Sequence, residues 1–230
     1  MSGPLWLSRA RLRRDAPIDA LTRLLVSEGA GARSGAAHKL VWALFADAED
    51  RRRDFLWREA VPGLFYLLSR RRPEDRQDIF KLDEPKLFSP VLSTGDRLAF
   101  SLRANATVAR GGGPGKRGKP CDVVMDALYT LPAGARADQR SHAVESAGLA
   151  WLSRQAEKAG FRFHPSSGDP RVMAYQALRI GHRDGGMKIG VLDFEGMLEV
   201  TDPGIFVAAV ASGFGRAKGF GCGLMLIRRA

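Results

Sequence analysis

Apolar and polar positions alternate in two successive sets of segments along the chain. In the first ninety residues or so, the pattern predicts a strand at 5–13, a helix at 34–47, and strands at 55–57 and 64–68. Pro62-Gly63 is a turn signal between the last two strands. The polar residues 74–96 are interrupted by prolines, so we expect a connection there with a short helix at most.

The second set begins after this connection. It comprises a strand at 97–108, a helix at 141–159, strands at 172–180 and 188–200, a helix from Pro203, and a strand at 224–227. Asp202 is a suitable N-cap, and Pro203 suits the first helical position. The order strand, helix, strand, strand, helix, strand is that of a ferredoxin-like, RRM-type sandwich. Because the first set follows the same plan more loosely, we predict an α+β protein with tandem ferredoxin-like domains at 1–90 and 97–230.

Composition adds a strong positive charge. The 230 residues include 36 Lys and Arg against 25 Asp and Glu, a formal net charge of +11, and 45% are hydrophobic, enough to bury a core. Such a charge attracts polyanions, and the predominance of arginine suits bidentate contacts with phosphate. Residues 110–120 hold four cations, five glycines and no acid. We expect that segment to be a loop that an anion orders.

Other classes of protein are disfavoured. The two cysteines, Cys121 and Cys222, stand in no metal-ligand or disulfide spacing. No apolar run approaches the length of a membrane span. We therefore expect a cytoplasmic protein that has no membrane partner and needs neither a metal nor an organic cofactor.

The carboxyl-terminal tail contains the densest candidate binding motif. Residues 213–223 carry five glycines interleaved with Arg216 and Lys218, a composition typical of a loop whose backbone N–H groups hold a phosphate. A nucleotide-binding loop is disfavoured, because the glycines follow a helix and precede a strand, the reverse of the required order. Residues 218–221 match the start of an RNA-recognition strand motif, but the match ends at Cys222. The remaining alternative is that the glycines only form a tight connection.

Five stretches together resemble the CasE family, the repeat-processing endoribonucleases of type I-E CRISPR Cascade complexes. They are Leu5–Ser8, His38–Phe45, Arg53–Trp57, Phe100–Asn105, and Phe194–Leu198 followed by the glycine-rich tail. The resemblance implies tandem RRM-like domains, metal-independent cleavage of precursor crRNA at the base of the repeat hairpin, and a product that stays bound. It also implies that the other Cascade subunits are partners.

The resemblance identifies His38 as the catalytic histidine. In the predicted helix, with Ser34 as N-cap, His38 falls just outside the apolar stripe and near the helix start, where we expect it to be half-buried. The reaction that the resemblance implies is attack by the RNA 2′-hydroxyl on the phosphate, leaving a 2′,3′-cyclic phosphate. Lys218 and Arg216 are our candidates for stabilising the developing charge.

One departure from the family concerns a second catalytic group. Related enzymes often carry a tyrosine about one helical turn before the histidine, where this chain has Ser34 and Gly35. Two alternatives stay open: Tyr66 or Tyr129 acts in its place, or His38 acts without one. The other histidines, His142, His164 and His182, are interpreted as structural or solvated.

RNA binding is assigned to the basic segments and to the tail. The candidates are Arg103, Arg110, Lys116, Arg117, Lys119, Arg179, Arg183, Gly215, Arg216, Gly219 and Gly221. One rival function is a hairpin-binding Cascade subunit that does not cut, which the absent tyrosine favours. Another is an RRM protein that binds single strands, which the scarcity of aromatic residues in strands 100–108 and 188–200 disfavours.

Overall fold

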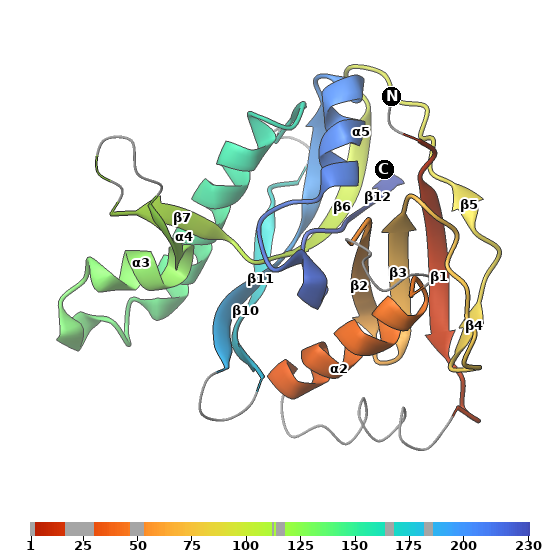
Figure 1. Ribbon diagram of the computed structural model, residues 1–230. Helices are drawn as coiled ribbons and strands as arrows, with labels where there is room; N and C mark the ends of the chain where they lie inside the picture. Colours follow the sequence, from red (N-terminus) through yellow and green to blue (C-terminus); the bar gives the residue numbers. More distant parts are fainter. Residues whose placement is uncertain are drawn as a thin grey trace.

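The computed structural model describes residues 3–16, 30–46, 53–111, 113, 118–163, 168–181 and 186–230. Two antiparallel sheets lie side by side, each with helical cover, as Figure 1 shows. Among the described residues, none of the helices combines the length and the apolar character that crossing a membrane requires.

The amino-terminal sheet has the strand order β2-β3-β1-β4, and β5 also pairs with β1. Its strands are β1 Trp6–Leu12, β2 Phe55–Val61, β3 Leu64–Ser69, β4 Phe80–Leu82 and β5 Lys86–Leu87. Helix α2, Ala30–Ala43, covers one face and buries Ala37 and Val41 against it. This is the ferredoxin-like strand order, with no helix in the described residues 70–79 where a second one would stand.

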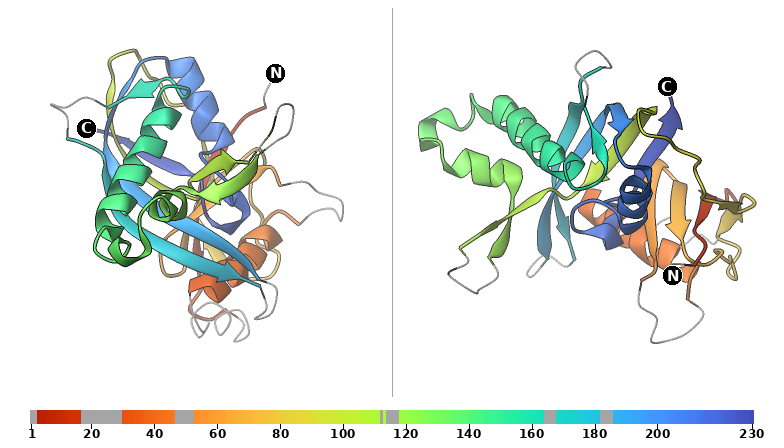
Figure 2. Two further views of the ribbon diagram at one scale, coloured as in Figure 1. Left: turned by 90° about the vertical axis from the view of Figure 1, so that its left-hand side faces the viewer. Right: turned by 90° about the horizontal axis from the view of Figure 1, so that it is seen from above.

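The carboxyl-terminal sheet has the order β10-β11-β6-β12, again the ferredoxin-like one. Its strands are β6 Arg97–Ala104, β10 Arg171–Ile180, β11 Met187–Val200 and β12 Met225–Arg229, with the short β9 Phe161–Arg162 beside β11. Helices α4, Arg140–Ala156, and α5, Pro203–Ser212, pack on one face (Figure 2). The fold class predicted from the sequence is confirmed.

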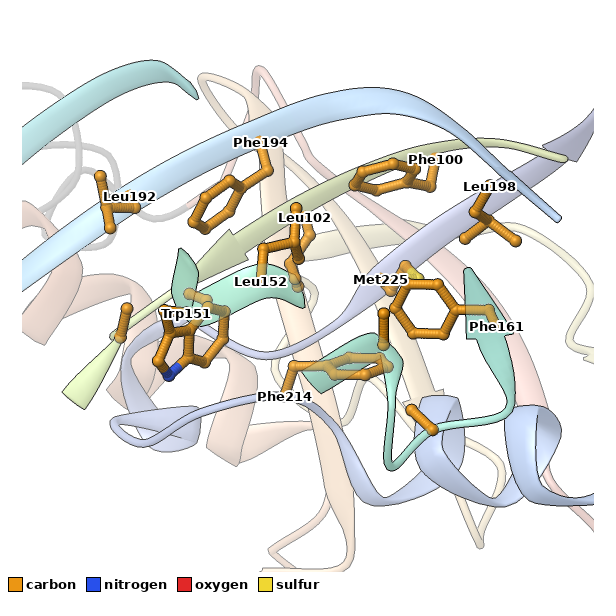
Figure 3. Packing of buried hydrophobic residues seen from close by; sticks show 14 of the residues in the cluster. Phe100, Leu102, Trp151, Leu152, Phe161, Leu192, Phe194, Leu198, Phe214 and Met225 are labelled. Atoms are coloured by element: carbon orange, nitrogen blue, oxygen red, sulfur yellow. The ribbon is translucent and has the colours of Figure 1, made fainter. Parts of the chain in front are cut away.

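The largest hydrophobic core lies between this sheet and its two helices. Figure 3 shows Trp151 of α4 facing Phe194 of β11, and Phe161 and Phe214 lie below the strands in this view. The Trp151 and Phe194 rings stack with centroids 5.9 Å apart, and Phe194 is fully buried. Leu56 of β2 also belongs to this core, which therefore joins the two sheets. The domain limits 1–90 and 97–230 stay a prediction.

Several predicted elements are confirmed. The β2–β3 hairpin turns at Gly63, whose φ of +78° favours glycine. The N-cap of α5 is Asp202, whose Oδ1 accepts a hydrogen bond from the backbone N–H of Ile205 at 2.9 Å. Helix α4 and the β10–β11 hairpin also form close to their predicted limits.

Other predictions are wrong in their boundaries. The helix predicted at 34–47 begins at Ala30, so Ser34 lies within it and is not its N-cap. The strand predicted at 97–108 is two strands, β6 and β7 Thr107–Arg110, because the chain leaves the sheet at Asn105. The side-chain amide of the buried Asn105 donates to the carbonyl oxygen of Gly190 at 2.7 Å. The backbone carbonyl of Asn105 accepts from the backbone N–H of Arg216 at 3.1 Å.

Several further short elements do not appear in the prediction. The connection at 74–96 holds the strands β4 and β5 in place of a short helix. Strand β8, Lys119–Asp122, pairs with β7 as a separate two-stranded ribbon. Helix α3, Val123–Tyr129, follows β8 directly and is capped by the Asp122 carboxylate. The short 3-10 helix η1, Ala133–Ala135, then leads to α4.

Candidate active site

His38 contacts the glycine-rich tail, which lies far from it in the sequence. It is half-buried in the third turn of α2, away from the helix N-terminus where the sequence placed it. Its Nδ1 lies 2.6 Å from the carbonyl oxygen of Gly219, in the short 3-10 helix η3, Lys218–Phe220. The rings of Phe220 and Trp42 flank the imidazole, with centroid distances of 5.3 and 5.8 Å. The fold therefore brings together the two features that the sequence singled out.

The contact with Gly219 determines that Nδ1 of the His38 ring carries a proton. A carbonyl oxygen only accepts hydrogen bonds, so Nδ1 must carry a proton and donate it. In the neutral ring, Nε2 is then unprotonated and can act as a base; in the imidazolium, Nε2–H can act as an acid. The same contact also restricts rotation of the ring, as a second partner does for catalytic and metal-bound histidines.

The tail loop is held by hydrogen bonds from both α2 and β2. The buried Trp57 of β2 donates its indole N–H to the carbonyl oxygen of Gly219 at 3.0 Å. Ser34 of α2 donates its hydroxyl to the next carbonyl oxygen, that of Phe220, at 3.1 Å. The Gly219 carbonyl thus accepts two hydrogen bonds, which hold it in place as the support for His38.

The backbone conformation and close packing of the tail require glycine at two positions. Gly221 has φ +78°, and a Cβ there would come 3.0 Å from the Trp57 ring. Gly215 has φ +72°, and a Cβ there would come 2.6 Å from the carbonyl oxygen of Asn105. These contacts account for two glycines by packing alone. Phosphate binding by Gly215, Gly219 and Gly221 stays a prediction.

Lys218 lies beside the carbonyl that supports His38. Its ammonium donates to the carbonyl oxygen of Ser212 at 2.6 Å. Burial lowers the pKa of Lys218, and the nearby charge of Arg53 lowers it further. Arg216 has an exposed side chain, while its backbone bridges to Asn105. Arg53 is a cation of this region that sequence reasoning missed, although it stands in one of the stretches that carry the family resemblance.

The other predicted RNA-binding residues are spread over the surface. Arg103 forms a bidentate, half-buried ion pair with Asp193 at 2.8 and 2.7 Å. Arg110 does the same on the surface with Asp126, at 2.8 and 2.7 Å. Both guanidiniums would have to exchange a carboxylate for a phosphate in order to bind RNA. Lys119 is exposed on the β7–β8 ribbon.

Arg179 is exposed near the end of β10, where its backbone touches the first turn of α2 at Gly31. Three candidate RNA-binding residues lie outside the described residues: Lys116, Arg117 and Arg183. All of these assignments stay predictions.

The two candidate tyrosines are remote from His38. Tyr66 packs on the sheet face that joins the carboxyl-terminal core, whereas α2 covers the opposite face. Tyr129 is 71% exposed at the end of α3, with the guanidinium of Arg136 over its ring at 5.2 Å. Of the other histidines, His142 is exposed in the first turn of α4, and His164 and His182 lie outside the described residues. These positions favour the alternative in which His38 acts without a tyrosine.

Several known proteins are similar to this chain over most of its length. A family model described as "CRISPR associated protein" matches residues 5–229. A Thermus thermophilus protein named CRISPR-associated endoribonuclease Cse3 is 31% identical over 195 residues, covering 78% of this chain and 82% of that protein. The Escherichia coli strain K12 protein named CRISPR system Cascade subunit CasE is 27% identical over 196 residues, covering 82% of this chain and 88% of that protein.

A solved structure is similar over nearly the whole chain. It is that of Thermus thermophilus Cse3 bound to an RNA representing a pre-cleavage complex. The TM-score is 0.66 at 25% sequence identity, and the match covers 98% of this chain and 99% of that one. The similarity therefore includes both sheets and the carboxyl-terminal tail.

Proposed function

Because the chain belongs to the CasE family of CRISPR-associated proteins, we propose that it is an endoribonuclease that cuts the hairpin of CRISPR repeat RNA. The single observation that carries this proposal is the hydrogen bond from His38 Nδ1 to the Gly219 carbonyl oxygen. It leaves Nε2 available for proton transfer beside a cationic loop, which is the arrangement that RNA cleavage by the 2′-hydroxyl needs.

The proposed reaction uses a nucleophile that the RNA itself supplies. The 2′-oxygen attacks the adjacent phosphorus, the bond from phosphorus to the 5′-oxygen breaks, and a 2′,3′-cyclic phosphate forms. The 2′-hydroxyl loses a proton to a base, and the departing 5′-oxygen gains one from an acid. His38 Nε2 performs one of these transfers, and each is worth about 10²–10⁴-fold in rate. Lys218 stabilises the negative charge that gathers on the phosphate oxygens.

The cut RNA then stays bound, and the protein joins Cascade as a subunit. The high positive charge supports sustained binding of an A-form stem through its phosphates. The name of the Escherichia coli relative, a Cascade subunit, supports the assembly role. Outside the tail, the described cations that we assign to the stem are Arg103, Arg110, Lys119 and Arg179.

We expect cleavage to proceed undiminished in EDTA, since no step above requires a metal ion. Repeat RNA incubated with protein and EDTA should give one 5′ fragment that ends in a cyclic phosphate. Treatment with acid, which opens that ring, followed by a phosphatase should remove the phosphate. A stable, uncut complex would instead support the rival function, a hairpin-binding subunit, which Ser34 and Gly35 in place of a tyrosine favour.

Trp57→Phe is expected to slow cleavage by up to about tenfold, because one hydrogen bond worth about 0.5–1.5 kcal/mol no longer holds the Gly219 carbonyl. Single-turnover rates on repeat RNA measure the effect. Phe65→Leu is the matched control, since Phe65 packs against Trp57 in the same core but has no polar contact with the loop. If both variants cut at the same rate, Trp57 serves packing alone.

A further inference from the structure

Arg53 is a partly buried cation that takes part in no ion pair among the described residues. It lies directly before Asp54 and β2, and its Nη1 is buried without a hydrogen-bond partner. The neighbouring carboxylate of Asp54 is engaged elsewhere, by Arg71, at 2.7 and 3.0 Å. Burial accordingly lowers the pKa of Arg53. An unpaired guanidinium in such a place is costly unless an anion completes it.

The ammonium of Lys218 lies at the same end of β2. It donates to the carbonyl oxygen of Ser212. The next residue, Gly213, packs so closely on Leu56 of β2 that an added Cβ would come 2.8 Å from Leu56 Cδ1. The hydrogen-bond acceptor of Lys218 is a neutral carbonyl, and Arg53 is the charged group that acts on the pKa of Lys218. The charge of Arg53 thus acts on Lys218, and no ion pair among the described residues joins either cation to a carboxylate.

We propose that Arg53 and Lys218 together bind one phosphate, the scissile phosphate of the RNA, and that Arg53 is a further catalytic residue. This inference rests on the proposed function. Lys218 directly precedes Gly219, whose carbonyl oxygen holds His38, and we therefore expect a phosphate bound by Lys218 to lie close to the proton-transferring ring. A phosphate fits because it accepts hydrogen bonds from a guanidinium and an ammonium at once.

The guanidinium has a role distinct from that of the ammonium. Two parallel N–H groups of Arg53 can hold two phosphate oxygens and so orient the phosphorus for attack by the 2′-oxygen. As the oxygens gain charge in the transition state, both cations bind them more tightly than in the ground state. Loss of one such contact typically slows catalysis about 10²–10³-fold.

Arg53→Gln is expected to lower the single-turnover cleavage rate about 100-fold. The control is Arg58→Gln. Arg58 lies within β2, five residues after Arg53, and also has a buried Nη1 without a partner, but the charged groups that act on it most, Asp193 and Arg103, belong to the carboxyl-terminal sheet. We expect Arg58→Gln to cut within a few-fold of the rate of the unaltered protein. Arg53→Lys keeps the charge but not the two parallel N–H groups, so its rate should lie between those of Arg53→Gln and the unaltered protein. Thermal unfolding of each variant separates lost chemistry from lost fold.

A second measurement does not depend on cleavage. Inorganic phosphate is titrated into protein with ¹³C-labelled lysine, and the Lys218 side-chain signal, assigned with Lys218→Arg, is followed by NMR. We expect a saturable shift in the unaltered protein and in Arg58→Gln, and a much weaker one in Arg53→Gln. Without added phosphate, Arg53→Gln should raise the pKa of Lys218, because the neighbouring positive charge is gone.

The two arms distinguish the inference from the function on which it rests. If the unaltered protein binds phosphate at Lys218 but cuts no RNA, the proposed function fails and the phosphate site stands. If Arg53→Gln cuts as fast as Arg58→Gln, or if phosphate shifts the Lys218 signal equally in both variants, Arg53 is not part of a phosphate site.

Discussion

Replacing His38 with alanine is expected to slow RNA cleavage by about 10²–10⁴-fold while the hairpin stays bound. In the proposed mechanism, the Gly219 carbonyl orients the imidazole for proton transfer, and a water molecule in its place would be neither held in position nor as good a proton carrier. The side chain is only half-buried, so the fold should tolerate its removal. Single-turnover cleavage measures the rate, and binding of an RNA with a 2′-deoxy group at the scissile nucleotide measures affinity.

The control for this variant is His142→Ala, which removes an exposed imidazole from α4. We expect it to cut at the rate of the unaltered protein. Full activity of His38→Ala would remove the proposed mechanism, because no other described histidine touches the tail. A loss of cleavage that is matched by an equal loss of affinity would instead make His38 a binding residue.

Gly31→Ala is expected to destabilise the protein by about 1–3 kcal/mol, as overpacking does. The first turn of α2 touches the backbone of β10, and a Cβ at Gly31 would come 1.9 Å from the carbonyl oxygen of Arg179. Helix α2 must therefore move away from the carboxyl-terminal sheet, and His38 moves with it. We expect urea unfolding to show the loss of stability and cleavage to fall with it.

Gly35→Ala on the same helix is the matched control. Its Cβ would lie 3.9 Å from Ile180 Cγ2, an ordinary contact, so the better helix propensity of alanine should raise stability by about 0.5–1 kcal/mol. Both substitutions replace glycine with alanine, yet they should change the free energy of unfolding in opposite directions. If Gly31→Ala also stabilises the protein, α2 does not rest on β10 as described.

Periodicity and caps were enough to predict most of the fold. The order of strands and helices at 97–228 implied the ferredoxin-like sheet, which the structure confirms, and Asp202 with Pro203 marked α5 correctly. The start of α2 was wrong because Ser34 looks like an N-cap in sequence, whereas its hydroxyl contacts the tail, 186 residues away. Short strands such as β4 and β5 form only by pairing with β1, and their own sequences do not show it.

The candidate site was predictable in its parts but not in its contacts. His38 and the glycine tail each stood out in the sequence, and the family resemblance, now confirmed, linked them to one reaction. Their hydrogen bond joins residues 181 positions apart, and local patterns carry no information over that separation. The partners of Arg103 and Arg110, and the lack of a hydrogen-bond partner for Arg53 Nη1, likewise depend on which side chains the fold brings close.

A structure of the protein with a repeat hairpin that carries a 2′-deoxy group at the scissile nucleotide tests the central claim most directly. We expect His38 Nε2 to lie within hydrogen-bond reach, about 2.6–3.2 Å, of the 5′-oxygen or of the position of the 2′-oxygen. The phosphate between them should contact Lys218. A hairpin bound on another face, with its scissile phosphate remote from α2 and the tail, would contradict the account.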